Sequence, residues 1–299
     1  MIKYPSAVAL GNFDGIHKGH QQVIQPIFKY PNLTPSLVTF IPHPQEFFTG
    51  KKKQLLTPIS EKCKILETLG VKQLILLRFD GDLANLTAEK FVKDILIKHI
   101  KANFISVGED FCFGYQRQGN AKYLELLAHQ YNVKVSITKE QNLTIRKESI
   151  RISSSYIRQN LSQGKPELAN EMLGREYQII GKVIEGQKLG RKIGFPTANL
   201  EIPSEKFLPK KGVYGVKVNV ENKHLLSNLP GVMNIGTRPT IEGKNISIEI
   251  HLLNWHGDLY NQILTVKLLN FIRPEQKFSS IDELKKQIKL DCQQLTIKV

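Results

Sequence analysis

At 299 residues the chain is longer than one hydrophobic core usually supports, so we expect two domains. Its composition of 41% hydrophobic and 23% charged residues excludes a disordered or fibrous protein. The 42 Lys and Arg outnumber the 27 Asp and Glu, and the net charge of +15 favours polyanionic ligands. The lysines are scattered apart from KKK at 51–53, which argues against a nucleic-acid partner, and a small polyanion such as ATP suits this charge as well.

The first half of the chain alternates strand-like with helix-like segments. The strand-like segments are 7–10, 36–40, 73–79 and 104–108, and the helix-like segments include 62–70 and 88–100. This order predicts an α/β domain whose doubly wound parallel sheet carries helices on both faces. Because ligands of such sheets bind beyond the carboxyl ends of the strands, the turn after 7–10 is the expected nucleotide site.

The second half consists of short strands separated by turns rich in Gly, Pro and Asn. The expected strands are 177–184, 212–220, 246–253 and 263–269. Their spacing predicts a small β-barrel. A terminal helix over 279–295 follows, and Ser280 and Glu283 have the spacing of a capping box. We therefore expect domains over 1–170 and 171–299.

The segment GNFDGIHKGH at 11–20 joins the first strand to a helix. Gly11 and Gly15 allow close approach of the backbone to a ligand, and the helix start offers unpaired N–H groups to phosphate. His17 and His20 add donors on the same face. An isolated pair of histidines at this spacing is usually a solvated surface feature, but three glycines, an acid and two histidines within ten residues predict a phosphate site.

The segment RISSSYIR at 151–158 places three serines at the start of a helix. Helix capping explains one serine, and leaves the other two and Arg158 unexplained. Hydroxyl groups and backbone N–H groups, with a guanidinium one turn into the helix, predict a second phosphate cradle.

Four motifs resemble the flavin adenylyltransferase domain of bacterial bifunctional riboflavin kinase/FAD synthetases. They are GNFDGIHKGHQ (11–21), TFIPHPQEFF (39–48), VGEDFCFG (107–114) and ISSSYIR (152–158), in the order and spacing of that family. The chain departs from the family in having Ser155 where Thr is more frequent, which retains the hydroxyl, and in having little chain before the first strand.

This resemblance implies that FMN attacks the α-phosphorus of ATP, without a covalent enzyme intermediate, to give FAD and pyrophosphate. It also implies roles for six residues: His17 and His20 hold ATP phosphates, Ser153, Ser154 and Arg158 steady the triphosphate, and Asp110 faces the flavin. From the residues alone, Asp110 fits a simple loop carboxylate equally well. His43, between two prolines, fits a rigid loop near the site or a direct contact.

The segment GRKIGFPTANL at 190–200 is the candidate metal site of the second half. Pro196 fixes the backbone, and an extended segment directs Thr197 and Asn199 to the same side. Two neutral oxygen ligands suit Mg²⁺, which takes its remaining ligands from water and phosphate. Composition alone favours an ordinary loop, but the segment resembles the PTAN motif of riboflavin kinases.

The strand at 246–252 alternates isoleucine and leucine with Ser247, Glu249 and His251. Most glutamates in such a position face solvent. However, GVMNIGTRPT (231–240), IEIHLLNWHGDLY (248–260) and FIRPEQKF (271–278) are similar to the flavokinase family in order. The resemblance implies that Glu249 is the general base toward the ribityl 5′-hydroxyl of riboflavin as it attacks the γ-phosphorus of ATP.

We therefore expect a bifunctional, Mg²⁺-dependent enzyme that acts on riboflavin, FMN and ATP. We also expect it to bind flavin, as a flavoprotein does. Two alternatives stay open. A related nucleotidyltransferase acting on another phosphate would share the two histidines but would have no use for Thr197, Asn199 and Glu249. A basic nucleic-acid-binding protein would turn over no flavin.

The apolar runs, such as LILL at 74–77, are too short to span a bilayer, and the first fifteen residues lack the pattern of a secretory signal. We therefore expect a cytoplasmic protein without a membrane partner. The three cysteines, Cys63, Cys112 and Cys292, are odd in number and widely spaced, so we expect reduced thiols.

Overall fold

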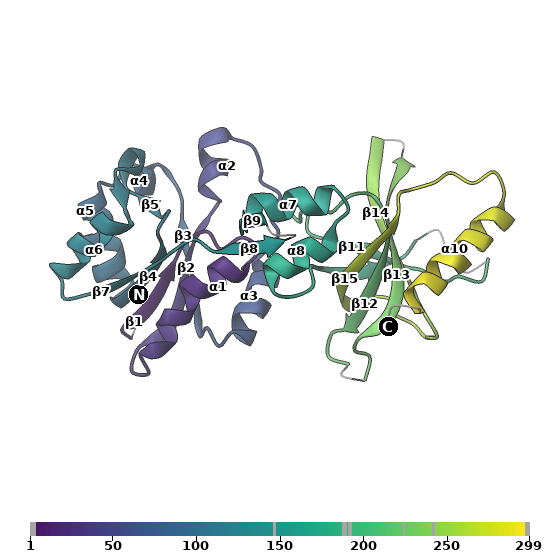
Figure 1. The fold of residues 1–299 in the computed structure, drawn as a ribbon, viewed down its shortest axis with the longest axis horizontal. Helices are drawn as coiled ribbons and strands as arrows, with labels where there is room; N and C mark the ends of the chain where they lie inside the picture. The colour runs from purple at the N-terminus through teal and green to yellow at the C-terminus, as the bar shows by residue number, and fades with distance from the viewer. Residues whose placement is uncertain are drawn as a thin grey trace. The chain divides into compact units, whose positions relative to one another are not determined.

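A computed structural model describes residues 4–145, 148–186, 190, 193–223, 225–240 and 243–296 (Figure 1). The chain forms two compact units, an N-terminal unit over Met1–Ser154 and a C-terminal unit over Ser155–Val299. Each unit has its own core and is described separately below.

The N-terminal unit is built on a five-stranded parallel sheet in the order β3-β2-β1-β4-β7 (Figure 1). The strands are β1 (Ser6–Leu10), β2 (Thr34–Ile41), β3 (Gln73–Arg78), β4 (Ala102–Gly108) and β7 (Lys134–Thr138). The chain winds outward from β1 through β2 to β3 and then returns to the other side of β1 as β4. This reversal makes the sheet doubly wound, as expected, with the switch point between β1 and β4.

Every residue of β1 is buried because helices cover both faces of the sheet. Ala7 and Ala9 pack in the core that includes residues of α1 (Lys18–Ile24) and α3 (Ile59–Thr68). Val8 and Leu10 pack in the opposite core, which includes residues of the helix over Phe91–His99 and of α6 (Ala121–His129). The two-residue period of a strand thus divides β1 between two apolar layers.

The helices differ in detail from the sequence expectation. The expected helix at 62–70 is α3, which begins at Ile59 and ends at Thr68. The expected helix at 88–100 begins as α5 (Ala88–Lys90) and continues as a π-helix over Phe91–His99. There the N–H of Ile100 donates to the carbonyl of Ile95, five residues earlier.

Shorter helices and strands connect the main elements of the N-terminal unit. They are η1 (Gln25–Lys29), α2 (Pro44–Thr49), α4 (Gly81–Ala84), β5 (Cys112–Phe113), η3 (Tyr115–Arg117), β6 (Gly119–Asn120), β8 (Asn142–Ile145) and β9 (Glu148–Arg151).

The C-terminal unit is a closed barrel with the strand order β10-β11-β14-β13-β12-β15, and β15 pairs back onto β10. Its strands are β10 (Gln178–Ile184), β11 (Ala198–Glu201), β12 (Gly212–Val220), β13 (Leu229–Thr240), β14 (Gly243–Leu252) and β15 (Ile263–Arg273). The terminal helix is α10 (Ile281–Thr296). The expected small β-barrel with a terminal helix is confirmed.

Strand β13 was not expected from the sequence, because Pro230, Gly231, Gly236 and Pro239 interrupt its pattern. Its pairing with β12 on one side and β14 on the other makes it a central strand of the barrel. Tertiary pairing therefore overrides a poor local propensity here.

The expected capping box at the start of α10 is confirmed in part: Ser280 caps the helix, whereas the Glu283 carboxylate accepts from Ser279, one residue before the cap. The N–H of Glu283 donates to Ser280 Oγ at 3.2 Å, and the Glu283 carboxylate accepts from Ser279 N at 3.1 Å. The helix is also held by an ion pair in which Nε and Nη2 of Arg273 donate to the buried carboxylate of Asp291.

Two helices precede the barrel, α7 (Ser154–Ser162) and α8 (Pro166–Leu173). The Asn170 side chain accepts from the Tyr177 N–H at 2.7 Å and donates to the Leu268 carbonyl at 2.9 Å. The expected domain boundary near residue 170 falls inside α8, whereas the compact units divide between Ser154 and Ser155. The boundary at 170 stays a prediction.

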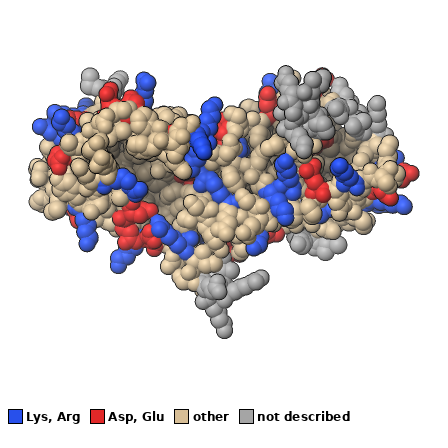
Figure 2. Space-filling model, turned by 90° about the horizontal axis from the view of Figure 1, so that it is seen from above, with Lys and Arg blue, Asp and Glu red and all other residues tan. Residues whose placement is uncertain are grey.

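The charged side chains are mixed on the surface shown in Figure 2, where Lys and Arg lie interspersed with Asp and Glu. Among the described helices, none is both long and apolar enough to cross a bilayer.

Candidate active sites

The turn from β1 to α1 has an unusual backbone. Phe13, Gly15 and Ile16 have φ angles of +48°, +92° and +42°. Positive φ is costly for a β-branched residue such as Ile16, so surrounding contacts must hold this turn in place. One such contact is Thr57, whose N–H donates to Asp14 Oδ1 at 3.1 Å and whose Oγ1 accepts from Gly15 N at 2.9 Å.

His17 and His20 have different roles in this turn. His17 is the N-cap of α1, and its Nδ1 accepts from the His20 N–H at 3.2 Å. Because Nδ1 accepts, the proton of neutral His17 resides on Nε2, the nitrogen that remains as a donor. The two rings stack with centroids 3.6 Å apart and planes 15° apart. Because His17 and His20 are three residues apart, His17 can cap α1 while its ring stacks on that of His20.

A cavity of about 670 Å³, here called the N-terminal cavity, lies at the carboxyl ends of the parallel strands. Leu10, Phe40 and Gly108, each at or near the end of a strand, contribute to its wall. This is where a doubly wound sheet binds its ligand. Of the predicted site residues, Gly11, His20, Asp110 and Ser154 line this cavity.

The other predicted phosphate-binding residues lie elsewhere. Gly15 and His17 are buried in the turn, and Ser153 is half-buried just before α7. Ser154 Oγ donates to the Asp14 carbonyl at 2.7 Å, which fixes Ser154 against the turn. Arg158 belongs to the C-terminal unit, where its guanidinium carbon lies 5.8 Å from the Phe207 ring centroid, and its role toward ATP stays a prediction.

Asp110 is exposed and forms an ion pair with Arg151, whose Nη2 lies 3.0 Å from Asp110 Oδ2. Arg151 also pairs with Glu140. The carboxylate is therefore held at the cavity wall by a cation from β9, a partner that the sequence analysis did not identify.

An aromatic cluster that was not predicted from the sequence contributes Phe40, Phe48 and Phe79 to the cavity wall. Phe79 lies edge-on to Phe40, Phe47 and Phe48, with ring centroids 5.5–5.8 Å apart. Phe48 is 70% exposed although it is a large apolar side chain. Exposed aromatic faces in a cavity suit a planar ring ligand. The signal was present as the FF pair of TFIPHPQEFF.

His43 both shapes a loop and lines the N-terminal cavity, so the two readings of this residue are compatible. Its Nδ1 accepts from the Gln45 N–H at 3.1 Å at the start of α2. Its Nε2 lies 3.2 Å from Nζ of Lys53, a further cationic residue of the cavity wall.

In the C-terminal unit, three predicted site residues meet across two neighbouring strands. Asn199 of β11 is paired in register with Glu249 of β14. Thr197 Oγ1 donates to Glu249 Oε2 at 3.2 Å. Because the Thr197 hydroxyl donates its proton to the carboxylate, its oxygen lone pairs remain available to a cation.

The loop before β11 has a second attachment to β14. Nδ1 of His251 lies 2.9 Å from the Pro196 carbonyl, and the His251 ring packs edge-on against Phe195. Glu249 and His251 are two residues apart on β14 and therefore lie on the same face of the strand. Glu249 contacts Thr197 and His251 contacts Pro196, so this face positions the loop before β11.

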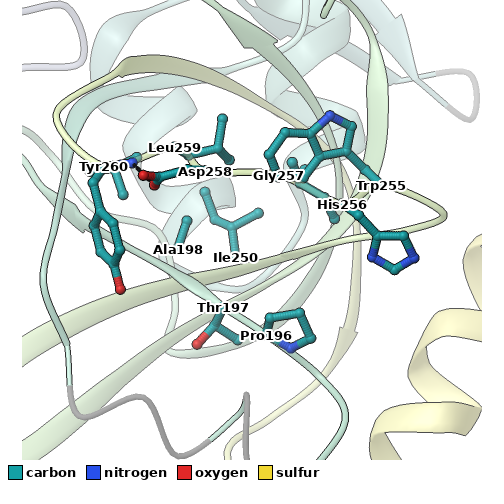
Figure 3. Close-up of a pocket in the computed structure, with 12 residues that line it drawn as sticks. Pro196, Thr197, Ala198, Ile250, Trp255, His256, Gly257, Asp258, Leu259 and Tyr260 are labelled. Atoms are coloured by element: carbon teal, nitrogen blue, oxygen red, sulfur yellow. Dashed lines mark hydrogen bonds between the residues drawn. The ribbon is translucent and has the colours of Figure 1, made fainter.

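A cavity of about 330 Å³, here called the C-terminal cavity, lies beside Thr197 (Figure 3). Trp255 and Tyr260 stand on opposite sides of it, with Ala198 and Ile250 between them. Most of its remaining wall comes from the segment 255–260, which the sequence analysis did not assign to the site. The aromatic residues of the WHGDLY segment were the available signal.

The donor set in the C-terminal unit fits Mg²⁺. Among the described residues, there is no cluster of three or more His, Cys, Asp or Glu arranged to hold a metal ion. The hydroxyl of Thr197 and the amide oxygen of Asn199 are hard oxygen donors, and the Glu249 carboxylate lies beside them. Mg²⁺ binds through few such donors and completes its shell with water and substrate phosphates.

Comparison with known proteins assigns each unit to a family. Residues 1–156 match the FAD synthetase family and residues 173–298 match the riboflavin kinase family. A bifunctional riboflavin kinase/FMN adenylyltransferase from Escherichia coli is 40% identical over 95% of this chain and 90% of that protein. The chain belongs to the bifunctional riboflavin kinase/FMN adenylyltransferase family. It phosphorylates riboflavin to FMN and transfers AMP from ATP to FMN, which yields FAD.

A second member of this riboflavin kinase/FMN adenylyltransferase family and one solved structure are also similar to this chain. The Haemophilus influenzae enzyme is 38% identical over 96% of this chain and 92% of its own. The crystal structure of a Streptococcus pneumoniae protein named macrolide-efflux protein has a TM-score of 0.85 at 30% identity, covering 97% of this chain and 93% of that one. The same fold therefore extends over nearly the whole chain.

Proposed function

We propose that the two reactions take place at two separate sites, one in each unit. Adenylyl transfer is assigned to the N-terminal cavity, and riboflavin phosphorylation to the group of Thr197, Asn199 and Glu249. The observation that carries the assignment is the hydrogen bond from Thr197 to Glu249, since it joins a candidate metal ligand to a candidate base within 3.2 Å. The N-terminal cavity is supported by its place at the switch point of the sheet.

In adenylyl transfer, a phosphate oxygen of FMN attacks the α-phosphorus of ATP while the bond to pyrophosphate breaks. The chain contributes position and charge and needs no nucleophile of its own. His20, Gly11 and Ser154 line the cavity and are assigned to the ATP phosphates. His17 orders the turn and offers Nε2–H as a donor. The Phe40–Phe48–Phe79 cluster is assigned to the flavin ring.

Asp110 is assigned to the flavin side of the same cavity, where the Arg151 guanidinium fixes its carboxylate. Ser153 and Arg158 complete the proposed phosphate-binding set. Both are supported by the family resemblance of ISSSYIR rather than by a contact within the N-terminal cavity.

In riboflavin phosphorylation, the ribityl 5′-hydroxyl attacks the γ-phosphorus of ATP and loses its proton, while the bond from that phosphorus to ADP breaks. Glu249 is the proposed acceptor of that proton. The Thr197 hydroxyl donates to Oε2 of Glu249, which orients the carboxylate for this role. His251 supports this arrangement by holding the Pro196 carbonyl.

We also assign Mg²⁺ to Thr197 and Asn199. When bound, it supplies charge neutralisation to the phosphate oxygens of ATP. The C-terminal cavity beside Thr197 is assigned to the planar ring of one of the two substrates, because Trp255 and Tyr260 flank it. A cytoplasmic location is part of the proposal, supported by the dependence of both reactions on ATP, and cell fractionation tests it.

Reciprocal substitutions test the two-site model. Glu249→Gln keeps the size of the side chain but removes its capacity to take a proton, so FMN formation should fall roughly 10²–10⁴-fold in kcat. Adenylylation of added FMN and the KM for ATP in the kinase reaction should stay within twofold of the wild type. Kinase turnover that survives this substitution would make Glu249 a simple strand-face carboxylate.

His20→Ala should have the opposite pattern. Loss of a donor to a phosphate should lower kcat/KM for FAD formation by about 10- to 100-fold, while FMN formation from riboflavin persists. Both rates are measured on the same folded preparation by separating FMN from FAD. Equal loss of both activities would indicate one shared site.

A further inference from the structure

A buried lysine contacts the β1–α1 turn from the protein interior and has no part in the chemistry described above. Lys62 of α3 is only 5% exposed. Its Nζ donates to the backbone carbonyl of Asn12 at 2.9 Å, across fifty residues of sequence. The cavity wall includes Asn12 itself, so Lys62 touches the far side of a segment that faces the ligand.

The Asn12 carbonyl accepts a second hydrogen bond, from Thr39 Oγ1 of β2 at 3.0 Å. Lys62 and Thr39 together draw this carbonyl toward the protein interior. Asn12 is followed by Phe13, whose φ of +48° is a strained backbone conformation for a non-glycine residue. Such a conformation persists only where neighbouring groups over-determine it. The two donors on Asn12 are part of that restraint.

The carboxylate of Asp14, which is only 4% exposed, interacts electrostatically with the ammonium group. Burial lowers the pKa of Lys62 to about 8, while the charges of Asp14 and the neighbouring Cys63 act in the opposite direction. Glu61, next to Lys62 on α3, is the other buried acid here. Lys62 is therefore mostly charged at neutral pH and begins to lose its charge in mildly alkaline solution.

We propose that Lys62 is a positioning residue for adenylyl transfer. Its hydrogen bond fixes the Asn12 carbonyl from the protein interior and so holds Gly11 and Asn12 in the backbone conformation that binds ATP. This inference rests on the assignment of the N-terminal cavity to adenylyl transfer. A fixed turn costs no reorganisation when ATP binds, whereas a released turn must be ordered by the ligand at the expense of affinity.

The first test is Lys62→Met, which keeps an unbranched side chain but removes the donor and the charge. The value of kcat/KM for ATP in FAD formation should fall by about 10- to 100-fold, mostly through KM. FMN formation by the same protein should stay within twofold. Lys62→Arg, which restores a charged donor, should recover part of the loss.

Lys206→Met is the matched control, since Lys206 is a comparably buried lysine, 2% exposed, in the C-terminal unit. It should leave kcat/KM for ATP in FAD formation unchanged. If Lys62→Met lowers the melting temperature but leaves this kcat/KM unchanged well below that temperature, Lys62 serves stability alone and the proposal is overturned.

The second test uses the wild-type enzyme and does not depend on a variant that folds. Between pH 7 and pH 10, kcat/KM for ATP in FAD formation should fall with an apparent pKa near 8, and the kinase reaction should lack this fall. Cys63→Ser should retain it, because the thiol lies beside Lys62 but makes no bond to Asn12. A flat profile up to pH 10 overturns the proposal.

Failure of this inference and failure of the site assignment give different results. If His20→Ala reduces FAD formation while Lys62→Met does not, the site is in the N-terminal cavity and Lys62 does not position it. If neither variant changes FAD formation, the assignment of the cavity itself is wrong.

Discussion

At the scale of single residues, the proposed kinase site is packed closely around Asn199. A Cβ atom added at Gly186 would lie 2.2 Å from Asn199 Nδ2 and 2.5 Å from its Cγ. No real contact is that short, so the Asn199 amide must move if Gly186 carries a side chain. Gly186 therefore leaves the space that the Asn199 amide occupies.

Gly186→Ala should therefore weaken the proposed Mg²⁺ site by displacing the Asn199 amide. We expect the Mg²⁺ concentration for half-maximal riboflavin phosphorylation to rise roughly 10- to 100-fold, with FAD formation from added FMN unchanged. A Mg²⁺ titration of both activities measures this.

Asn199→Ala and the double variant Gly186→Ala/Asn199→Ala provide the control. If Gly186 acts through Asn199, the double variant should be no worse than Asn199→Ala alone, because the two changes disrupt the same group. Additive losses would mean that Gly186 matters for another reason.

At the scale of elements, α10 is joined to the end of β15 by one ion pair. Arg273 Nη2 lies 2.8 Å from Asp291 Oδ2, and Gln287 Nε2 donates to Asp291 Oδ1 at 2.9 Å. The Asp291 side chain is 2% exposed and that of Arg273 is 14% exposed. Breaking one partner of a buried pair is expensive because the other charge stays buried without compensation.

Asp291→Ala should accordingly destabilise the C-terminal unit by about 3 kcal/mol, the lower end of the range for buried pairs, because Arg273 is not fully enclosed. Chemical denaturation followed by loss of riboflavin phosphorylation measures the change. Asp282→Ala, at an exposed position in the first turn of the same helix, should cost less than about 1 kcal/mol. Equal effects of the two changes would show that the ion pair adds nothing beyond helix stability.

At the scale of the whole molecule, the helices before the barrel belong with the C-terminal unit. Leu161 of α7 accepts from Lys210 N at 2.9 Å, and Asn170 of α8 bonds to Tyr177 and Leu268. A cut at residue 170 removes these contacts and divides α8, whereas a cut after Ser154 retains them.

We therefore expect fragment 171–299 to phosphorylate riboflavin by itself, as the domain boundary predicts, but to unfold at a lower temperature than fragment 155–299. Circular dichroism melts and an FMN assay on both fragments test this. Equal melting temperatures would mean that α7 and α8 are dispensable to the barrel. If fragment 155–299 folds but makes no FMN, the two-site model is wrong.

Local patterns in the sequence predicted those features that depend on neighbours along the chain. The alternation of segments predicted the doubly wound sheet, and the pair Ser280 and Glu283 predicted the start of α10. The motifs around His20 and Glu249 led to the family. These features were readable because helix caps, strand periods and motifs are each set within a few residues.

Only the tertiary structure decided which distant groups meet. Lys62 reaches Asn12 across fifty residues, and Thr197 reaches Glu249 because β11 and β14 pair in one register. Strand β13, with its glycines and prolines, is a strand only because two neighbours pair with it. Register and packing arise from contacts between segments far apart in sequence, and no local pattern of residue types encodes them.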